Sequence, residues 1–141
     1  MARQAHRRIR IFSHELDAAC YDNREMIDAI KDLALKIPDV GIFILLQNNE
    51  KVRQSGHRLV ELATRLPSKI RIFRPHQAEH RRHAENFMLV DDYGLVHQPL
   101  YSQSEGTACF HDPMRVRDLR HFFQEVWDQS EEDVLLRRLS I

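Results

Sequence analysis

The feature that most constrains the fold is the unbroken apolar segment VGIFILL at residues 40–46, which lies between two segments with helical periodicity. Apolar and polar side chains do not alternate within it, and this is typical of a strand that is buried on both faces of a sheet. The segment is also far shorter than the roughly 20 apolar residues that a membrane-spanning helix needs. The sequence therefore predicts a central buried strand, and we expect no membrane association.

The flanking segments are predicted to be helices, each of which ends at a proline. Asp22 and Glu25 have the spacing of a capping box, and apolar side chains then recur at three- and four-residue steps as far as Pro38. A second periodic segment, 59–66, ends at Pro67. Strands that such helices connect are expected to run parallel, because the chain must cross back before the next strand begins.

Shorter apolar segments extend the predicted sheet. Tyr93 and Gly94 separate two of them by a tight turn, which predicts an antiparallel hairpin. Asp112 and Pro113 have the residue types of an N-cap and a first helical position, so a last helix is expected to begin there. We expect a mixed sheet flanked by helices, with strands near 9–12, 40–46, 69–73, 87–91, 95–100 and 107–110, the first three of them parallel.

Composition and charge indicate one globular domain, 1–141. The chain of 141 residues is 43% hydrophobic and 30% charged, and no repeat or linker divides it. Its 21 basic and 21 acidic side chains cancel, so no global field favours nucleic acid. The charges are unevenly placed, with a basic N-terminal arm at about 1–8 and an acidic tail at about 131–141. No secretory signal is recognisable and the two cysteines are predicted to be reduced, so we expect a cytoplasmic protein.

The segment AENFMLVDD at 84–92 resembles the HxKxxxxD motif of the phospholipase D superfamily, an apolar strand that ends in acids. The predicted order of strands and helices over about residues 8–130 also resembles one half of such an enzyme. The chain is similar, in addition, to a small family of uncharacterised bacterial domains, some of which are fused behind an N-acetyltransferase domain. The resemblance implies an α/β fold of the phospholipase D-like half type.

The resemblance also implies which side chains should carry the chemistry. In that superfamily two motifs meet at a twofold axis, where their histidines attack the phosphodiester and protonate the leaving group while their lysines hold phosphate oxygens. The alignment places Ala84 at the histidine, Asn86 at the lysine and Asp91 at the aspartate, and the Gly-Ser that follows falls on Gln98 and Pro99. Ala84 cannot attack phosphorus, and Asn86 has no charge. We therefore predict a pseudo-enzyme without cofactor or metal, in which Ala84 and Asn86 share one face of a strand and point into a concavity.

Two alternatives for the same region stay open. His83 is one position early for the motif, but a β-bulge could re-aim it, which would allow a phosphodiesterase or nuclease that uses His83 and Asp91. His76, His80 and His83 are spaced four and three apart and could share a helix face near Glu79 as a zinc site. The abundance of arginine and the lack of further clear ligands argue against zinc.

Arginines around the degenerate motif suggest a positive function. Guanidinium groups bind phosphate or carboxylate without any catalytic histidine, so we predict an anion-binding site, the alternative being that these groups pair with the chain's own acids. The candidate residues are Arg71, Arg74, Arg81, Arg82 and His83. Nucleic acid is a weakly supported ligand. We expect either a homodimer or an acetyltransferase-type protein partner, with Leu95, Val96, Leu100 and Tyr101 at the centre of a twofold interface.

Overall fold

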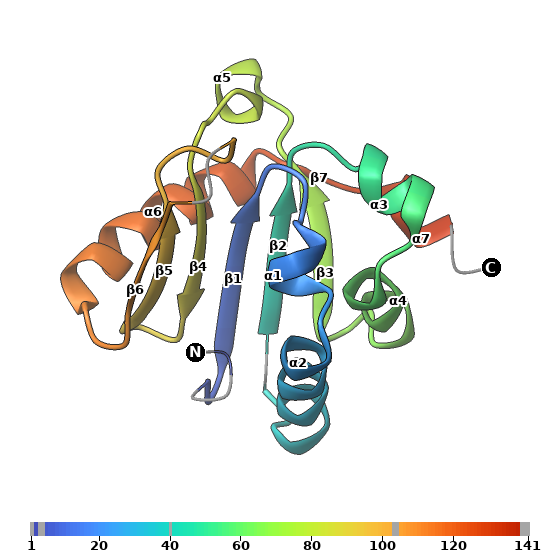
Figure 1. Cartoon of the computed structure of the whole chain (residues 1–141), viewed down its shortest axis with the longest axis horizontal. Helices are drawn as coiled ribbons and strands as arrows, with labels where there is room; N and C mark the ends of the chain where they lie inside the picture. The colour runs from blue at the N-terminus through green and yellow to red at the C-terminus, as the bar shows by residue number, and fades with distance from the viewer. Residues whose placement is uncertain (1, 3–4, 40, 103–104, 139–141) are drawn as a thin grey trace.

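The computed structural model describes residues 2, 5–39, 41–102 and 105–138. In this part of the chain the strands form one seven-stranded mixed sheet in the order β6-β5-β4-β1-β2-β3-β7 (Figure 1). The strands are β1 (Arg8–Ser13), β2 (Gly41–Leu46), β3 (Ile70–Arg74), β4 (Asn86–Val90), β5 (Gly94–Gln98), β6 (Thr107–Cys109) and β7 (Glu131–Glu132). The helices are α1 (Ala18–Tyr21), α2 (Arg24–Lys36), α3 (Glu50–Ser55), α4 (Arg58–Arg65), α5 (Ala78–Arg81), α6 (Pro113–Asp128) and α7 (Val134–Arg138).

The strand directions agree with the sequence-based prediction. Strands β1, β2 and β3 are parallel neighbours, whereas β4 runs antiparallel to β1. Strands β4 and β5 form the antiparallel hairpin expected around Tyr93 and Gly94, and β6 extends it by a further antiparallel strand. The α/β fold with a mixed sheet flanked by helices is confirmed.

Helices cover the two faces of the sheet at different places. Figure 1 shows α1 to α4 over strands β1 to β3 on one face, and α6 behind β4 and β5 on the other. Side-chain alternation along β4 divides its residues between the two cores. Phe87 and Leu89 pack in the aromatic core that α6 covers, whereas Met88 and Val90 belong to the aliphatic core that α2 and α4 cover. Every buried position of β4 therefore has a defined face.

The two predicted N-caps have different outcomes. Asp112 caps α6 as expected, since its Oδ1 accepts from the backbone N–H of Arg115 at 3.3 Å. Asp22 does not cap α2. Asp22 is instead the C-cap of the short helix α1, and its carboxylate accepts from Arg58 Nε at 2.7 Å. The next residue, Asn23, caps α2 instead and accepts from the N–H of Met26.

Where the structure describes them, the predicted basic arm and acidic tail are folded parts of the domain; residues 1, 3 and 4 of the arm lie outside the described residues. Arg8 is the first residue of β1, and the backbone N–H groups of His6, Arg7 and Arg8 all donate to one carboxylate. At the other end, β7 pairs with β3 and Asp133 is buried, so within 131–138 the tail completes the sheet edge; residues 139–141 lie outside the described part. No helix in the described ranges is long and apolar enough to span a bilayer.

Candidate functional site

Asn86, at the motif's lysine position, ties three segments together. Its Oδ1 accepts from the backbone N–H of His14, just after β1, and its Nδ2 donates to Gln98 Oε1 on β5; both distances are 2.9 Å. Asn86 and Gln98 line a cavity of about 320 Å³. Ala84 lies in the loop before β4, where its carbonyl accepts from the N–H of Tyr101 at 2.8 Å, and it does not line that cavity. The expected concavity is thus present beside Asn86 alone.

Asp91 lies at the opposite end of β4 from Ala84 and Asn86. It is five residue steps along an extended strand from Asn86, a distance of roughly 16 Å. The Asp91 backbone has a φ of 52°, and its carboxylate accepts from three N–H groups of residues 6–8 at 2.8–2.9 Å and from the Tyr93 hydroxyl at 3.2 Å. Partial burial acts to raise the pKa of Asp91, but these hydrogen bonds outweigh it and lower the pKa below its usual value. Asp91 therefore has a structural role, because it fixes the N-terminal segment against the end of β4.

His83 faces α6, away from Asp91. Its ring lies against Phe12 and Phe122, at centroid distances of 5.2 and 4.5 Å. Its Nε2 is 3.5 Å from Glu85 Oε1, and the other Glu85 oxygen contacts His97 at 2.5 Å. Burial lowers the pKa of His83, although the Glu85 charge opposes the shift. The hypothetical pair of His83 with Asp91 does not form, because the two residues flank opposite ends of β4.

Three of the five candidate anion-binding residues line one pocket. Its volume is about 530 Å³, and its lining includes residues that follow β1 and β2, the last residue of β3 and residues of α5. Figure 1 shows the carboxyl ends of these three parallel strands at one edge of the sheet. In α/β sheets the carboxyl ends of parallel strands are the usual place for ligands. The lining consists of His14, Leu46, Gln47, Asn48, Asn49, Arg74, Pro75, Ala78, Arg81, Arg82 and Asp133.

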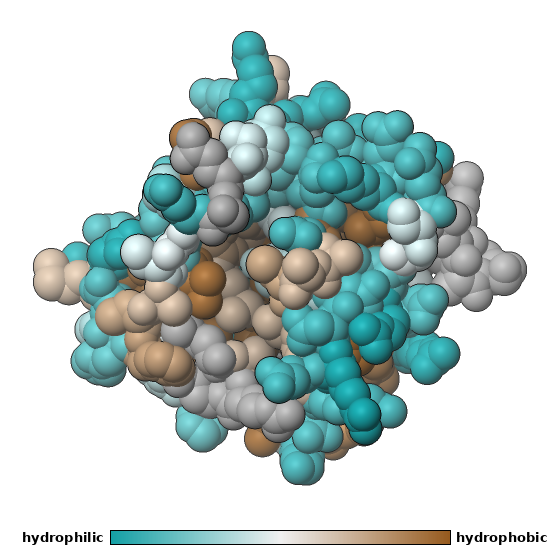
Figure 2. Space-filling model, in the orientation of Figure 1, coloured by the Kyte–Doolittle hydropathy of each residue, from teal (hydrophilic) through white to brown (hydrophobic). Residues whose placement is uncertain are grey.

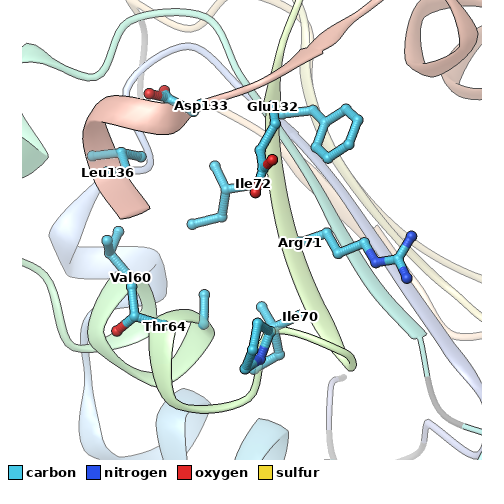
Figure 3. Close-up of a pocket in the computed structure, with 11 residues that line it drawn as sticks. Val60, Thr64, Ile70, Arg71, Ile72, Glu132, Asp133 and Leu136 are labelled. Atoms are coloured by element: carbon cyan, nitrogen blue, oxygen red, sulfur yellow. The ribbon is translucent and has the colours of Figure 1, made fainter. Parts of the chain in front are cut away.

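Arg71 and His83 do not line this pocket, so the structure brings together only three of the five predicted residues. On β3, Ile70 and Ile72 are buried against the aliphatic core, so alternation turns Arg71 to the opposite face. Figure 3 shows a separate apolar pocket of about 420 Å³, in which Ile72, Val60 and Leu136 point inward and the guanidinium of Arg71 points away. His83 does not line the arginine pocket, because its ring packs against Phe122 of α6.

The arginine-lined pocket carries cations that the chain only partly neutralises. Arg74 pairs with Glu131 at 3.4 Å, and the Arg82 Nε donates to the Ala78 carbonyl at 3.2 Å. The buried carboxylate of Asp133 is held by the Asn49 amide at 3.0–3.1 Å. Among the ion pairs of the described residues, none involves Arg81 or Arg82. These two exposed guanidinium groups are open to an external anion.

His14 is the functional candidate that the sequence did not reveal. It follows β1 directly, lines both the arginine pocket and the cavity beside Asn86, and stacks on Tyr101 at a centroid distance of 3.7 Å. Its Nδ1 lies 3.0 Å from Gln47 Oε1. The sequence Ser13-His14-Glu15 is not a clear signal of a catalytic triad, because the side chains of adjacent residues rarely point at a common atom. The sequence feature that could have identified His14 is its position directly after a strand expected to be parallel, since ligands often bind at the carboxyl ends of such strands.

The three clustered histidines do not converge on a shared point. His76 is exposed beside Glu131, at 3.7 Å, while His80 is buried and His83 lies in the aromatic core. Within the described residues, no three His, Cys, Asp or Glu side chains are placed to hold a metal ion.

Comparison with solved structures defines the class of fold. The chain is similar to Nuc from Salmonella typhimurium, a phospholipase D family member, with a TM-score of 0.61 and 11% identity over 93% of this chain and 84% of that one. It is equally similar to NucT from Helicobacter pylori, with a TM-score of 0.61 and 12% identity over 93% of this chain and 85% of that one. The fold is therefore phospholipase D-like.

The family model named "Domain of unknown function (DUF7931)" matches residues 1–139, and the chain belongs to this family. Comparison with curated proteins found no match.

Proposed function

We propose that this domain is a catalytically inactive phospholipase D-like module that binds an anionic, phosphate-type ligand and associates with another protein chain. The observation that carries the proposal is the contrast between two places in the fold. The motif positions hold Ala84 and Asn86, whereas Arg74, Arg81 and Arg82 gather in a pocket at the carboxyl ends of the parallel strands.

The side chains at the motif positions have no catalytic group to offer. A phospho-enzyme step needs a nucleophile that titrates near neutral pH, and alanine has none. The Asn86 amide is engaged on both sides, with His14 and Gln98, so it serves as a structural tie. The imidazole that is adjacent in sequence to the motif, His83, is packed between Phe12 and Phe122.

The arginines supply the positive charge and hydrogen-bond donors that anion binding needs, and this does not require a catalytic group. A guanidinium presents planar paired donors that match phosphate oxygens, and such charge-assisted hydrogen bonds are stronger than neutral ones. Arg81 and Arg82 carry no ion pair among the described residues, so binding there does not first require a salt bridge to break. Three amide side chains line the same pocket, and while those of Gln47 and Asn49 already donate within the chain, Asn48 adds a further polar group.

Calorimetric titration with inorganic pyrophosphate tests the binding site. We expect the double variant Arg81→Ala/Arg82→Ala to bind at least about tenfold more weakly than wild type, since one charge-assisted hydrogen bond contributes about that factor. The matched control is Arg24→Ala, which removes an exposed arginine on α2 far from the pocket. Equal affinity of wild type and double variant, or equal losses in double variant and control, would show that the pocket is not the site.

The association surface that we propose is the face of β5 turned away from α6, joined to the loop after β5; on the same face of β4, Met88 and Val90 are buried. Figure 2 shows apolar residues around a hollow on this face. Val96 is half-buried there, and Leu100 and Tyr101 are each 43% exposed. Leu95, which was expected at the interface, is instead 1% exposed under α6, because alternation turns it to the other face.

A second copy of the chain is the partner we propose for this surface. An isologous contact must be self-complementary, and a chain of zero net charge with separate acidic and basic segments in its sequence can meet that requirement. Light scattering at micromolar concentration should give the mass of a dimer, and Leu100→Asp should give that of a folded monomer whose melting temperature no longer depends on protein concentration. A monomeric wild type would overturn this part of the proposal.

A further inference from the structure

We infer that the arginine pocket is selective for phosphomonoesters over phosphodiesters, and that His14 makes the distinction. This inference rests on the proposed function, because it specifies which anion the pocket takes. It is carried by the hydrogen-bond network that fixes the imidazole of His14 at the pocket's edge.

Gln47 determines which nitrogen of neutral His14 carries the proton. The Gln47 Nε2 group donates to two backbone carbonyls, those of His80 and His83, at 3.0 Å each. The amide is therefore oriented with Oε1 toward His14, at 3.0 Å from Nδ1. An amide oxygen only accepts, so Nδ1 must carry the hydrogen and Nε2 is left with its lone pair.

The ring is held in place but remains accessible. Tyr101 stacks on one side of it with an interplanar angle of 15°. The side chain of His14 is 20% exposed, and the nearest carboxylate oxygen to Nε2, Glu15 Oε1, is 4.0 Å away. The other oxygen of Glu15, Oε2, pairs with Lys51 at 2.9 Å. Nε2 is thus free to meet a ligand held at the shared edge of the two cavities.

The chemistry of the two ester classes differs in the feature that His14 can recognise. A phosphomonoester carries about 1.5 to 2 negative charges near neutral pH and has an oxygen that takes up a proton with a pKa of about 6. That oxygen can share one proton with His14 Nε2 while Arg81 and Arg82 bind the others. A phosphodiester has one charge and no oxygen that is protonated near neutral pH, so it lacks both the extra charge and the shared proton.

Calorimetric titration of the wild-type protein with 4-nitrophenyl phosphate and with bis(4-nitrophenyl) phosphate at neutral pH tests the inference. We expect the monoester to bind about tenfold more tightly, the factor that one charge-assisted hydrogen bond contributes. His14→Phe keeps an aromatic ring against Tyr101 but removes both nitrogens, so it should lose most of this preference while the diester affinity stays unchanged. The matched control, His111→Phe, changes a ring that stacks on Tyr93 at the other end of the β4–β5 hairpin and should keep the preference.

A measurement on the wild-type protein alone covers the case in which His14→Phe fails to fold. Long-range proton–nitrogen correlation spectra should assign His14 as the Nδ1–H tautomer and show its Nε2 signal moving on addition of 4-nitrophenyl phosphate. An Nε2–H tautomer, an unmoved Nε2 signal, or a diester that binds as tightly as the monoester would overturn the inference and leave anion binding intact. Failure of pyrophosphate and both esters to bind would overturn the proposed function as well.

Discussion

Replacement of Asp91 by alanine separates a structural role for the motif aspartate from a catalytic one. The change removes the carboxylate that accepts three backbone hydrogen bonds. It also leaves an alanine at a φ of 52°, a left-handed conformation that a polar side chain such as aspartate tolerates better. Hydrogen bonds to a charged group contribute about 1.5–3 kcal/mol each when buried, but two of these N–H groups are exposed and water replaces the lost partner. Together with about 1 kcal/mol of left-handed strain, we expect the free energy of unfolding to fall by about 3 kcal/mol.

Two further substitutions divide this loss into its parts. Asp91→Gly removes the hydrogen bonds but relieves the strain, and Asp91→Asn tolerates the left-handed backbone and keeps one acceptor oxygen. The expected order of destabilisation is Ala, then Gly, then Asn, with a melting-temperature decrease of roughly 10 °C for the alanine variant. Scanning calorimetry and urea titration measure both quantities. An alanine variant as stable as wild type, or a glycine variant less stable than the alanine one, would refute this structural role of Asp91.

The pH dependence gives an independent check of Asp91. Its folded-state pKa is below the unfolded value of about 3.9, because the hydrogen bonds outweigh the burial that acts to raise it. A carboxylate of this kind contributes stability above the unfolded pKa and loses it as pH falls through the folded pKa. The difference in unfolding free energy between wild type and Asp91→Asn should therefore be constant above about pH 5 and shrink below pH 4.

Three other substitutions test different parts of the structure. Burial lowers the pKa of His83 in the folded state, so as pH falls through about 6.5 the unfolded chain takes up a proton before the folded one does. Wild type should therefore lose stability relative to His83→Phe between pH 7.5 and pH 5.5, as measured by urea titration at each pH. Phe123→Ala should cost about 3–5 kcal/mol by urea titration, since this ring is 1% exposed in the core beneath α6. Gln47→Ala should weaken pyrophosphate binding several-fold in calorimetry with little change in melting temperature, because it releases the carbonyls of His80 and His83, which flank Arg81 and Arg82.

The main features of the fold could be predicted because they depend on local patterns. The run at 40–46 lacks alternation since β2 is covered on both faces, and the pairing of β4 with β5 follows from the turn at Tyr93 and Gly94. The N-cap at Asp22 was misplaced because Asp22 and Asn23 are both good capping residues. The choice depends on the short helix α1 and on Arg58, which is distant in sequence.

The site was predicted less well because it depends on side-chain direction. Arg71 and Arg74 are close in sequence, yet alternation and strand position place them at different pockets. His83 looked like part of the basic segment, and only the packing of α6 shows that its ring belongs to an aromatic core. His14 became a candidate once the parallel strands placed its strand end beside those of β2 and β3, a long-range juxtaposition without a local signature.

Turnover of bis(4-nitrophenyl) phosphate and of DNA by the purified domain, with and without divalent metal ions, tests the central claim most directly. The proteins to compare are wild type, His83→Ala and His14→Ala, purified in the same way. The account predicts that wild type releases no more product than either variant under any of these conditions. Robust wild-type turnover that His83→Ala or His14→Ala abolishes would contradict it, because one of these imidazoles would then be catalytic.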